Sequence, residues 1–375
     1  MGRKSARLRV GLIGAGLVGQ AAHAYFLWDD RDRFEFVALA DPSPAVRAAV
    51  GDRYGIHERH AGFDDLLGLG LDAVVVAVPD AFHADIACAA LTAGLHVLCE
   101  KPLALSLEEC DRIAAARDAS GRVLQVGTMK RFDPAYLRLL ELLPERAEDV
   151  RYLSVEVRDP DQRPFVAHLP MTAASDLQPE LGVELRTRMA SRIREAAGGQ
   201  PPAGGARAFE AYLSALVHDV SLLQGVLEHL GAPWCEAADD GAWWDEGRAV
   251  SLSAALPGGG RAHLMHHNLP GVNAYSERVT LHCSDRVLEL TFPSPYLRHE
   301  PTRLVEYRSD GATGLRETTL HVSYEEAFRE ELRAFAEACA GRAPVVTPVE
   351  AGRADVALLL DAYGHAIARA RSAAP

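Results

Sequence analysis

The glycine spacing near the N-terminus constrains the fold more than any other feature of the sequence. Residues 10–19 read VGLIGAGLVG, an apolar run followed by Gly14, Gly16 and Gly19 at the spacing G-x-G-x-x-G. Here the first glycine permits a tight turn, the second lets the backbone approach a pyrophosphate, and the third brings the helix close to the strand. The stretch therefore predicts a dinucleotide-binding loop. A glycine-rich turn of another α/β domain is the alternative.

The acidic residue after the next strand-like run supports this interpretation. Residues 34–40 read FEFVALA and lead into Asp41, where a ribose-binding carboxylate is expected. Such a carboxylate hydrogen-bonds a ribose 2′-OH and repels a 2′-phosphate, so NAD is predicted over NADP. Arg47 is the nearest downstream arginine that could offset this preference. The alternative role for Asp41 is to cap the helix that starts near Pro44.

The order of strand-like and helix-like segments predicts an α/β fold. Apolar runs alternate with helical patterns from residue 8 to 127, which is typical of a doubly wound parallel Rossmann sheet. After Gly127 the segments alternate polar and apolar residues, which predicts an α/β domain with an open, mostly antiparallel sheet. We expect an NAD-binding domain over 1–128 and a substrate-binding and oligomerisation domain over 129–375. The last helix is a candidate to pack back on the first domain.

Composition excludes several classes of partner. The formal net charge of -13 argues against nucleic acid and anionic membranes. Six cysteines without a C-x-x-C pair indicate reduced thiols in the cytoplasm. Arg3 and Lys4 precede an apolar stretch that resembles a signal peptide. Cleavage there would remove the predicted phosphate loop, so we interpret these residues as a solvated basic tail.

Several motifs in order resemble one enzyme family. After the glycine motif come Val76-Ala77-Val78-Pro79 with His83, then GLHVLCEKP over residues 94–102, then Arg131-Phe132-Asp133-Pro134. The C-terminal stretch 323–366 also fits. Together they resemble the glucose–fructose oxidoreductase, inositol dehydrogenase and rhizopine-catabolism (Gfo/Idh/MocA) family. The likeness covers most of the chain and is weakest from 160 to 215.

The resemblance implies an activity and a set of site residues. Typical members transfer a hydride between nicotinamide and a secondary alcohol or ketone of a sugar, inositol or related polyol, as homodimers or homotetramers. Lys101 and His218 match the family's catalytic lysine and histidine. The expected substrate contacts are Lys101, Arg131, Ser214 and His218. The expected cofactor contacts are Gly14, Ala15, Gly16, Leu17, Val18, Gly19, Asp41, Pro79, His83, Glu100 and Lys101.

One position departs from the family pattern. An aspartate usually lies four residues before the histidine, one helical turn away, and here that position is Ser214. A serine cannot stabilise an imidazolium by charge. Asp219 is adjacent to His218 in sequence and is expected to point elsewhere on the helix. The departure puts the usual Asp–His pairing in doubt and leaves Lys101 or a group of the substrate as alternatives to His218 in the proton transfer.

Other residues leave alternatives open. His263, His266 and His267 form a histidine cluster, but adjacent strand residues face opposite sides, so no metal is predicted. Residues 172–205 are expected to form a helix and a mobile loop over the substrate cleft, or a solvated insertion. Two other functions remain: an NAD-dependent glycosidase that oxidises its substrate transiently, and a non-catalytic NAD-binding sensor.

Overall fold

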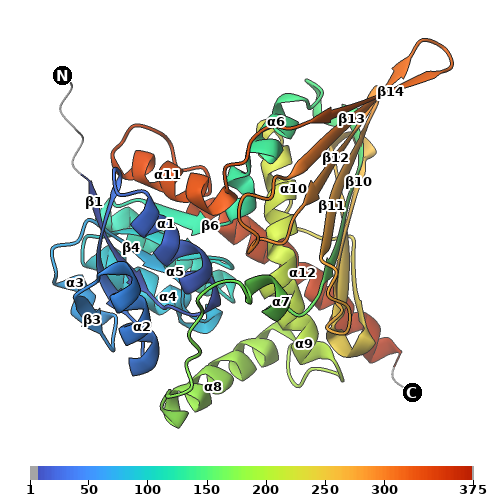
Figure 1. The fold of residues 1–375 in the computed structure, drawn as a ribbon. Helices are drawn as coiled ribbons and strands as arrows, with labels where there is room; N and C mark the ends of the chain where they lie inside the picture. The colour runs from blue at the N-terminus through green and yellow to red at the C-terminus, as the bar shows by residue number, and fades with distance from the viewer. Residues whose placement is uncertain (1–6, 374–375) are drawn as a thin grey trace, which may run out of the picture. The chain divides into compact units, whose positions relative to one another are not determined.

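The computed structural model describes residues 7–373, so Arg3 and Lys4 of the expected basic tail lie outside the described residues. The chain divides into two compact units, each built from more than one stretch (Figure 1). The first contains residues 1–127, 166–189 and 328–352. The second contains residues 128–165, 190–327 and 353–375.

The first unit contains a six-stranded, wholly parallel sheet in the order β3-β2-β1-β4-β5-β6. Its strands are β1 (Leu8–Ile13), β2 (Phe34–Ala40), β3 (Glu58–His60), β4 (Ala73–Val76), β5 (His96–Glu100) and β6 (Leu124–Gly127). All four residues of β4 are buried, as expected for a strand covered on both faces. The strand order reverses between β1 and β4, where ligands bind at the carboxyl ends of such sheets. The predicted doubly wound fold is confirmed.

Local signals in the sequence explain where the helices of this unit begin and end. The α5 helix (Leu107–Ser120) begins after Ser106, whose hydroxyl accepts the Glu109 N–H at 3.2 Å, and it ends at the left-handed Gly121. The helix after β1 opens as the π-helix η1 (Gly19–His23). The remaining helices include α1 (Ala24–Asp29), α2 (Pro44–Tyr54), α3 (Asp64–Leu67), α4 (His83–Thr92) and α11 (Ala327–Cys339).

The outer edge of β6 is covered by a segment that comes much later in the sequence. The Val126 N–H donates to the Thr347 carbonyl at 2.8 Å, and the Thr347 hydroxyl donates to the Val126 carbonyl at 2.7 Å. The Gln125 amide also donates to the backbone carbonyl of Glu331 in α11 at 3.1 Å. Residues 328–352 therefore complete the first unit.

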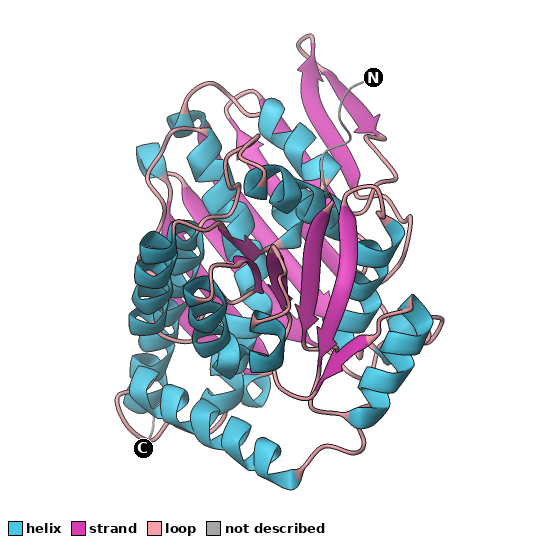
Figure 2. Ribbon diagram, turned by 90° about the vertical axis from the view of Figure 1, so that its left-hand side faces the viewer, coloured by secondary structure: helices cyan, strands magenta, loops and turns pink. Residues whose placement is uncertain are grey.

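The second unit contains an eight-stranded sheet in the order β14-β13-β12-β11-β7-β10-β9-β8. Figure 2 colours the strands magenta and the helices cyan. Only β7 and β10 pair in parallel, and the other pairs are antiparallel. The predicted open, mostly antiparallel sheet is confirmed. The strands are β7 (Val150–Asp159), β8 (Asp240–Trp244), β9 (Ala249–Ala255), β10 (Arg261–Asn268), β11 (Ser276–Cys283), β12 (Arg286–Phe292), β13 (Arg303–Asp310) and β14 (Gly314–Leu320).

Helices cover one face of this sheet. The Tyr212 hydroxyl, in the π-helix η5 (Ala211–Leu216), donates to the carbonyls of Ala242 in β8 and Ser251 in β9 at 2.9 and 2.7 Å. The other helices of this unit include α6 (Pro134–Glu141), α9 (Gly205–Glu210) and α10 (Val217–His229). The helices α7 (Arg163–Val166), α8 (Pro179–Ala196) and α12 (Val349–Ser372) have residues in both units.

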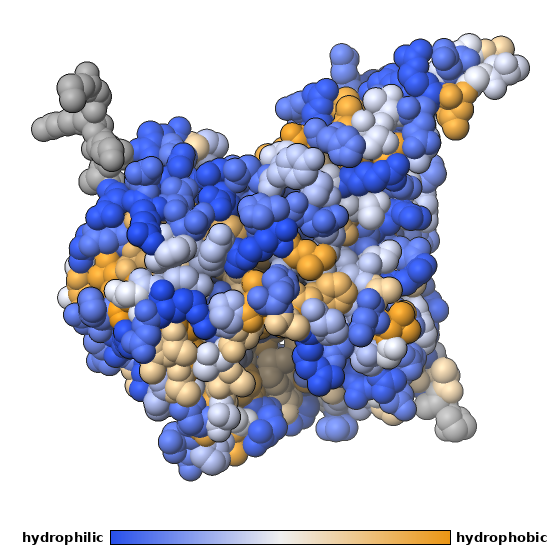
Figure 3. All heavy atoms as spheres, viewed as in Figure 1, coloured by the Kyte–Doolittle hydropathy of each residue, from blue (hydrophilic) through white to orange (hydrophobic). Residues whose placement is uncertain are grey.

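The visible surface of the protein is largely polar (Figure 3). Hydrophilic residues cover most of the face shown in Figure 3. Within residues 7–373, no helix has the length and apolar character that crossing a membrane requires.

Candidate active site

The glycine-rich loop has the geometry that a close backbone approach requires. Gly14 has φ +89°, and a Cβ there would lie 2.4 Å from the carbonyl oxygen of Ala77. A Cβ on Gly19 would lie 2.4 Å from the carbonyl oxygen of Gly14, so the helix packs directly on the turn. A Cβ on Gly16 would meet nothing within 4 Å. Space is therefore open beside Gly16, where the motif places a pyrophosphate.

Asp41 is fixed by backbone donors at the end of β2. Its Oδ2 atom accepts the Ala15 N–H at 2.8 Å, and its Oδ1 atom accepts the Ser43 N–H at 2.9 Å. The side chain is buried. Each carboxylate oxygen retains a lone pair for a further donor, such as a ribose hydroxyl. The guanidinium of Arg47 donates to the backbone carbonyl of Asp41 at a distance of 2.5 Å.

Glu100 is held by a buried histidine at the carboxyl end of β5. The Nε2 atom of His23 donates to Glu100 Oε1 at 2.7 Å, and Glu100 Oε2 accepts the Lys101 N–H at 3.2 Å. Burial raises the pKa of the Glu100 carboxyl, but the hydrogen bond and charge of His23 outweigh it, so the pKa lies below its usual value. A fixed carboxylate thus precedes the predicted catalytic lysine.

A second buried histidine holds the segment after Lys101. The Nδ1 atom of His83 lies 2.7 Å from the carbonyl oxygen of Pro102, and its Nε2 atom lies 2.9 Å from the carbonyl oxygen of Val78. The Lys101–Pro102 bond is cis. Because His83 joins the strand ends of β4 and β5, it fixes the backbone around both Pro79 and Lys101.

A buried carboxyl group lies behind Glu100. Glu331 of α11 is fully buried, and neither of its carboxylate oxygens has a hydrogen-bond partner among the described residues. Burial and the nearby charge of Glu100 raise the pKa of Glu331 well above its usual value. The folded protein therefore favours the protonated form of Glu331.

The predicted histidine and serine of the second unit lie where a π-helix joins an α-helix. Ser214 belongs to η5, and His218 lies in the first turn of α10; both side chains are half-buried. A π-turn contains an extra residue, so the spacing of four does not place the two side chains as a regular α-helix would. Asp219, the next residue, is buried.

Asp219 belongs to a buried charged cluster that sequence reasoning missed. The Lys130 Nζ atom lies 2.6 Å from Glu277 Oε1 and 3.9 Å from Asp219 Oδ1, and all three side chains are buried. The Tyr275 hydroxyl donates to Glu277 Oε2. Burial lowers the pKa of Lys130, but the neighbouring carboxylates outweigh it and the net shift is upward. Burial raises the pKa of the Asp219 carboxyl well above its usual value.

Arg131 is engaged inside the second unit. The residue is 4% exposed, its Nη2 atom lies 2.6 Å from Glu228 Oε2, and its Nη1 atom donates to the Ser221 carbonyl at 3.3 Å. Both partners belong to α10. The guanidinium thus ties η3 (Met129–Phe132) to the helix that carries His218. Its assignment to the substrate stays a prediction.

The three histidines of β10 do not converge. His266 is buried and lies 3.6 Å from Asp159 Oδ2, whereas His267 lies 3.2 Å from Asp245 Oδ2. His263 lies on the opposite face of the strand from His266 and contacts the ring of Tyr152. Within the described ranges, no three histidine, cysteine or acidic side chains are grouped so that they could hold a metal.

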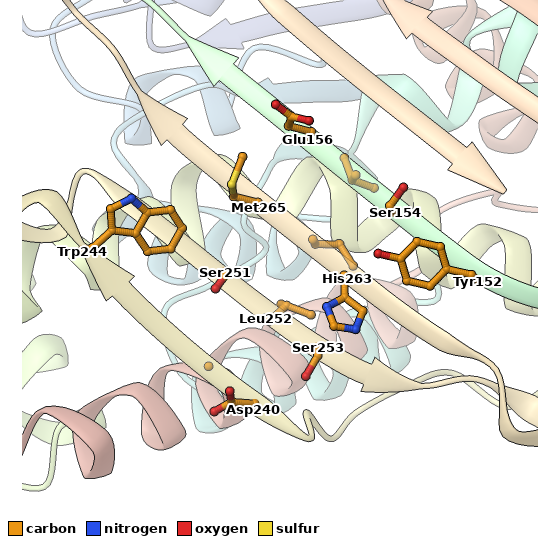
Figure 4. Close-up of a pocket in the computed structure, with 13 residues that line it drawn as sticks. Tyr152, Ser154, Glu156, Asp240, Trp244, Ser251, Leu252, Ser253, His263 and Met265 are labelled. Atoms are coloured by element: carbon orange, nitrogen blue, oxygen red, sulfur yellow. The ribbon is translucent and has the colours of Figure 1, made fainter. Parts of the chain in front are cut away.

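The open face of the second sheet carries a shallow polar pocket (Figure 4). Cross-strand pairing places Ser154, His263 and Ser253 in one row, with Met265 and Ser251 in the next. Trp244 lies at the rim and is 41% exposed. This face is opposite to the buried side chain of His266.

Comparisons with known proteins agree with the fold and with the first unit. The model of a family described as "Oxidoreductase family, NAD-binding Rossmann fold" matches residues 8–128. Inositol 2-dehydrogenase 1 of Saccharopolyspora erythraea is 42% identical over 142 residues, which cover 36% of this chain and 41% of that enzyme. Inositol 2-dehydrogenase of Salmonella typhimurium is 32% identical over 139 residues, covering 36% of this chain and 41% of that enzyme. The chain thus spans about two fifths of the length of these curated relatives.

Solved structures resemble the whole chain. UDP-N-acetylglucosamine 3-dehydrogenase from Acidithiobacillus ferrooxidans has a TM-score of 0.70 and 22% identity, over 98% of this chain and 100% of that chain. The apo scyllo-inositol dehydrogenase from Lactobacillus casei has a TM-score of 0.69 and 18% identity, over 97% of both. These identities support a shared fold. Residues 8–128 therefore resemble the Rossmann domain of this oxidoreductase family.

Proposed function

We propose that this protein is an NAD(H)-dependent oxidoreductase that transfers a hydride between nicotinamide and a secondary alcohol or ketone of an inositol, a sugar or a sugar derivative. The observation that carries the proposal is the segment after β5. There the carboxylate of Glu100, held by His23, directly precedes Lys101 at the edge of the sheet where ligands bind. The curated relatives are inositol 2-dehydrogenases, so inositols are the first substrates to test.

The residues of the first unit fit a dinucleotide. Open space beside Gly16 and the backbone from Gly14 to Gly19 suit a pyrophosphate, and Asp41 suits an adenine ribose with a free 2′-OH. We therefore propose NAD rather than NADP as the cofactor. Pro79, His83 and Glu100 would position the nicotinamide half.

Each predicted catalytic residue has a chemical task. Bound NAD supplies the hydride acceptor, and a protein group must take the proton of the substrate hydroxyl. The ammonium of Lys101 orients and polarises the substrate oxygen. His218 accepts the proton as a general base, since an imidazole titrates near neutral pH. Ser214 can hydrogen-bond the substrate but supplies no charge to His218.

The deciding experiment is an absorbance assay for NADH with NAD and a panel of inositols, sugars and glycosides, with product analysis in parallel. We expect NADH to form with at least one polyol. The Lys101→Ala variant should lose the activity, whereas Arg146→Ala, at an exposed arginine of the second unit, should keep it. Glycoside cleavage without net NADH would contradict the proposal, as would NAD binding with no turnover.

Assembly and compartment are part of the same proposal. The family resemblance favours a homodimer or homotetramer in the cytoplasm. Light scattering on the eluting protein measures the assembly directly. A monomer at micromolar concentration that is active in the NADH assay would contradict the oligomer.

A further inference from the structure

Residues 172–188 cross the edge of the first unit where the cofactor is expected. The segment is held to the glycine-rich loop by Gln20, which is 4% exposed. The Gln20 side chain donates to the Thr172 carbonyl and accepts the Thr172 N–H, both at 2.9 Å. The same amide donates to the Ala15 carbonyl at 2.7 Å. This crossing segment is therefore attached beside the predicted phosphate site.

The second attachment is a carboxylate at the start of α2. Asp176 accepts hydrogen bonds from the Ser43 hydroxyl and from the Ala45 N–H, the latter at 2.8 Å. Ser43 is the N-cap of α2, so the carboxylate lies at the positive end of an eleven-residue helix. The Ser43 hydrogen bond and the Ala45 N–H hold the pKa of Asp176 below its usual value. Asp176 therefore remains an anion.

The third attachment lies beyond β4. The Nη1 atom of Arg188 lies 2.7 Å from Asp85 Oδ2 in α4, and its guanidinium lies 4.7 Å from the centre of the Phe82 ring. The three attachments thus lie after β1, β2 and β4, which are neighbours in the sheet. Ligands of a doubly wound sheet bind at the carboxyl ends of its strands.

Two carboxylates meet at Ser43. Asp41 Oδ1 accepts the Ser43 N–H at 2.9 Å, and Asp176 accepts the Ser43 hydroxyl. The hydroxyl and the Ala45 N–H are the donors that a 2′-phosphate would need at this helix start. Arg47, the nearest cation that could help, donates to the backbone carbonyl of Asp41.

We propose that Asp176 is a specificity-determining residue that excludes the 2′-phosphate of NADP(H). Resting on the proposed dinucleotide-binding function, the inference adds a second determinant to Asp41, supplied by the crossing segment. Asp176 takes up the donors that a phosphate would use and adds a negative charge where the phosphate would lie. Asp41 remains available to the ribose hydroxyls of NAD(H).

The test is a binding titration of the purified full chain with NADH and with NADPH, followed by nicotinamide fluorescence. The Asp176→Asn and Asp176→Ser variants remove the charge at an exposed position. We expect either variant to improve NADPH binding relative to NADH by about tenfold. Glu180→Gln, at another exposed carboxylate of the same segment, should leave the ratio unchanged.

The outcomes separate the selectivity role from the proposed function. Selectivity by Asp176 is overturned if the variants leave the ratio of the two affinities within about twofold of the wild type. It is also overturned if both affinities fall equally, because Asp176 would then serve only to attach the segment. A wild-type chain that binds neither nucleotide overturns the proposed function, and this inference with it.

Discussion

The Nε2 atom of His23 lies 2.7 Å from Oε1 of Glu100, and neither side chain is open to solvent. His23 ends the π-helix η1 after the glycine-rich loop, while Glu100 ends β5. One hydrogen bond therefore couples the predicted phosphate-binding helix to the residue before Lys101.

Removing this histidine should destabilise the protein. His23→Leu leaves the Glu100 carboxylate buried without its partner, which costs about 3 kcal/mol in the free energy of unfolding. His23→Gln keeps an N–H donor and should lower the free energy of unfolding by a smaller amount. Denaturant unfolding measures the free energy of unfolding of both variants. The control is His60→Gln, because His60 forms a more exposed pair with Glu58. This control should lower the free energy of unfolding by only ~0–1 kcal/mol. Equal losses for His23→Leu and His60→Gln would contradict the role of the buried pair.

Glu331 should make stability depend on pH. Its folded-state pKa is raised, so above the ordinary glutamate pKa of ~4.3 the unfolded chain releases a proton that the folded chain keeps. Stability is therefore lost as pH rises from that value towards the folded-state pKa, by about 1.4 kcal/mol per unit. Glu331→Gln should remove this loss.

The measurement compares the unfolding free energies of Glu331→Gln and the wild type at pH 5, 6 and 7. The advantage of the variant should increase with pH. The control is Glu337→Gln in the same helix, where the hydrogen bond from Arg342 lowers the pKa of the exposed Glu337 carboxyl. This control should show no such increase. A difference between Glu331→Gln and wild type that is constant across pH would refute the buried neutral carboxyl.

The effects of substituting Lys130 and Glu277 on stability should be coupled. Lys130→Met leaves Glu277 as an uncompensated buried charge and should lower the free energy of unfolding by about 3–5 kcal/mol. Combining it with Glu277→Gln removes both charges and should restore part of that loss. A double-mutant cycle measures the coupling. Additive effects of the two substitutions would show that the ion pair is not coupled.

Two helix glycines should respond oppositely to alanine. A Cβ on Gly225 in α10 would lie 2.2 Å from the Tyr136 hydroxyl and 2.4 Å from Arg131 Nε. Gly225→Ala should therefore cost about 1–3 kcal/mol. A Cβ on the exposed Gly364 in α12 meets nothing within 4 Å, so Gly364→Ala should stabilise by about 0.5–1 kcal/mol. Thermal melts of the two variants provide the test, and shifts of the same sign would contradict it.

Local pattern was enough to predict the fold and much of the first unit. The apolar residues 73–76 indicate a doubly buried strand, and the spacing of Gly14, Gly16 and Gly19 indicates the turn that the structure contains. These features depend on neighbours in the sequence. The π-helices were not predicted, because an extra residue in one turn leaves no distinct hydrophobic period in so short a stretch.

Pairings between distant residues could not be predicted. Lys130 and Glu277 are 147 positions apart, and Ser43 and Asp176 are 133 apart. A single sequence contains no signal for such pairs until the topology brings them together. Nothing local in the sequence indicated that Asp219 lies near Lys130. For Arg131, the sequence left two interpretations, a ligand contact or an ordinary surface charge. The structure instead buries its side chain against α10.

Thr347 pairs with the edge of β6 but is synthesised long after that strand, which has a consequence during protein synthesis. Until residues 328–352 leave the ribosome, the backbone groups of Val126 that pair with Thr347 have no partner from that segment. At a translation rate of about 5–20 residues per second, roughly 10–40 s pass between synthesis of β6 and synthesis of the segment that pairs with it. An unpaired strand edge is a template for pairing with other chains. Chaperone capture of nascent chains should therefore peak in this interval and end when α11 docks.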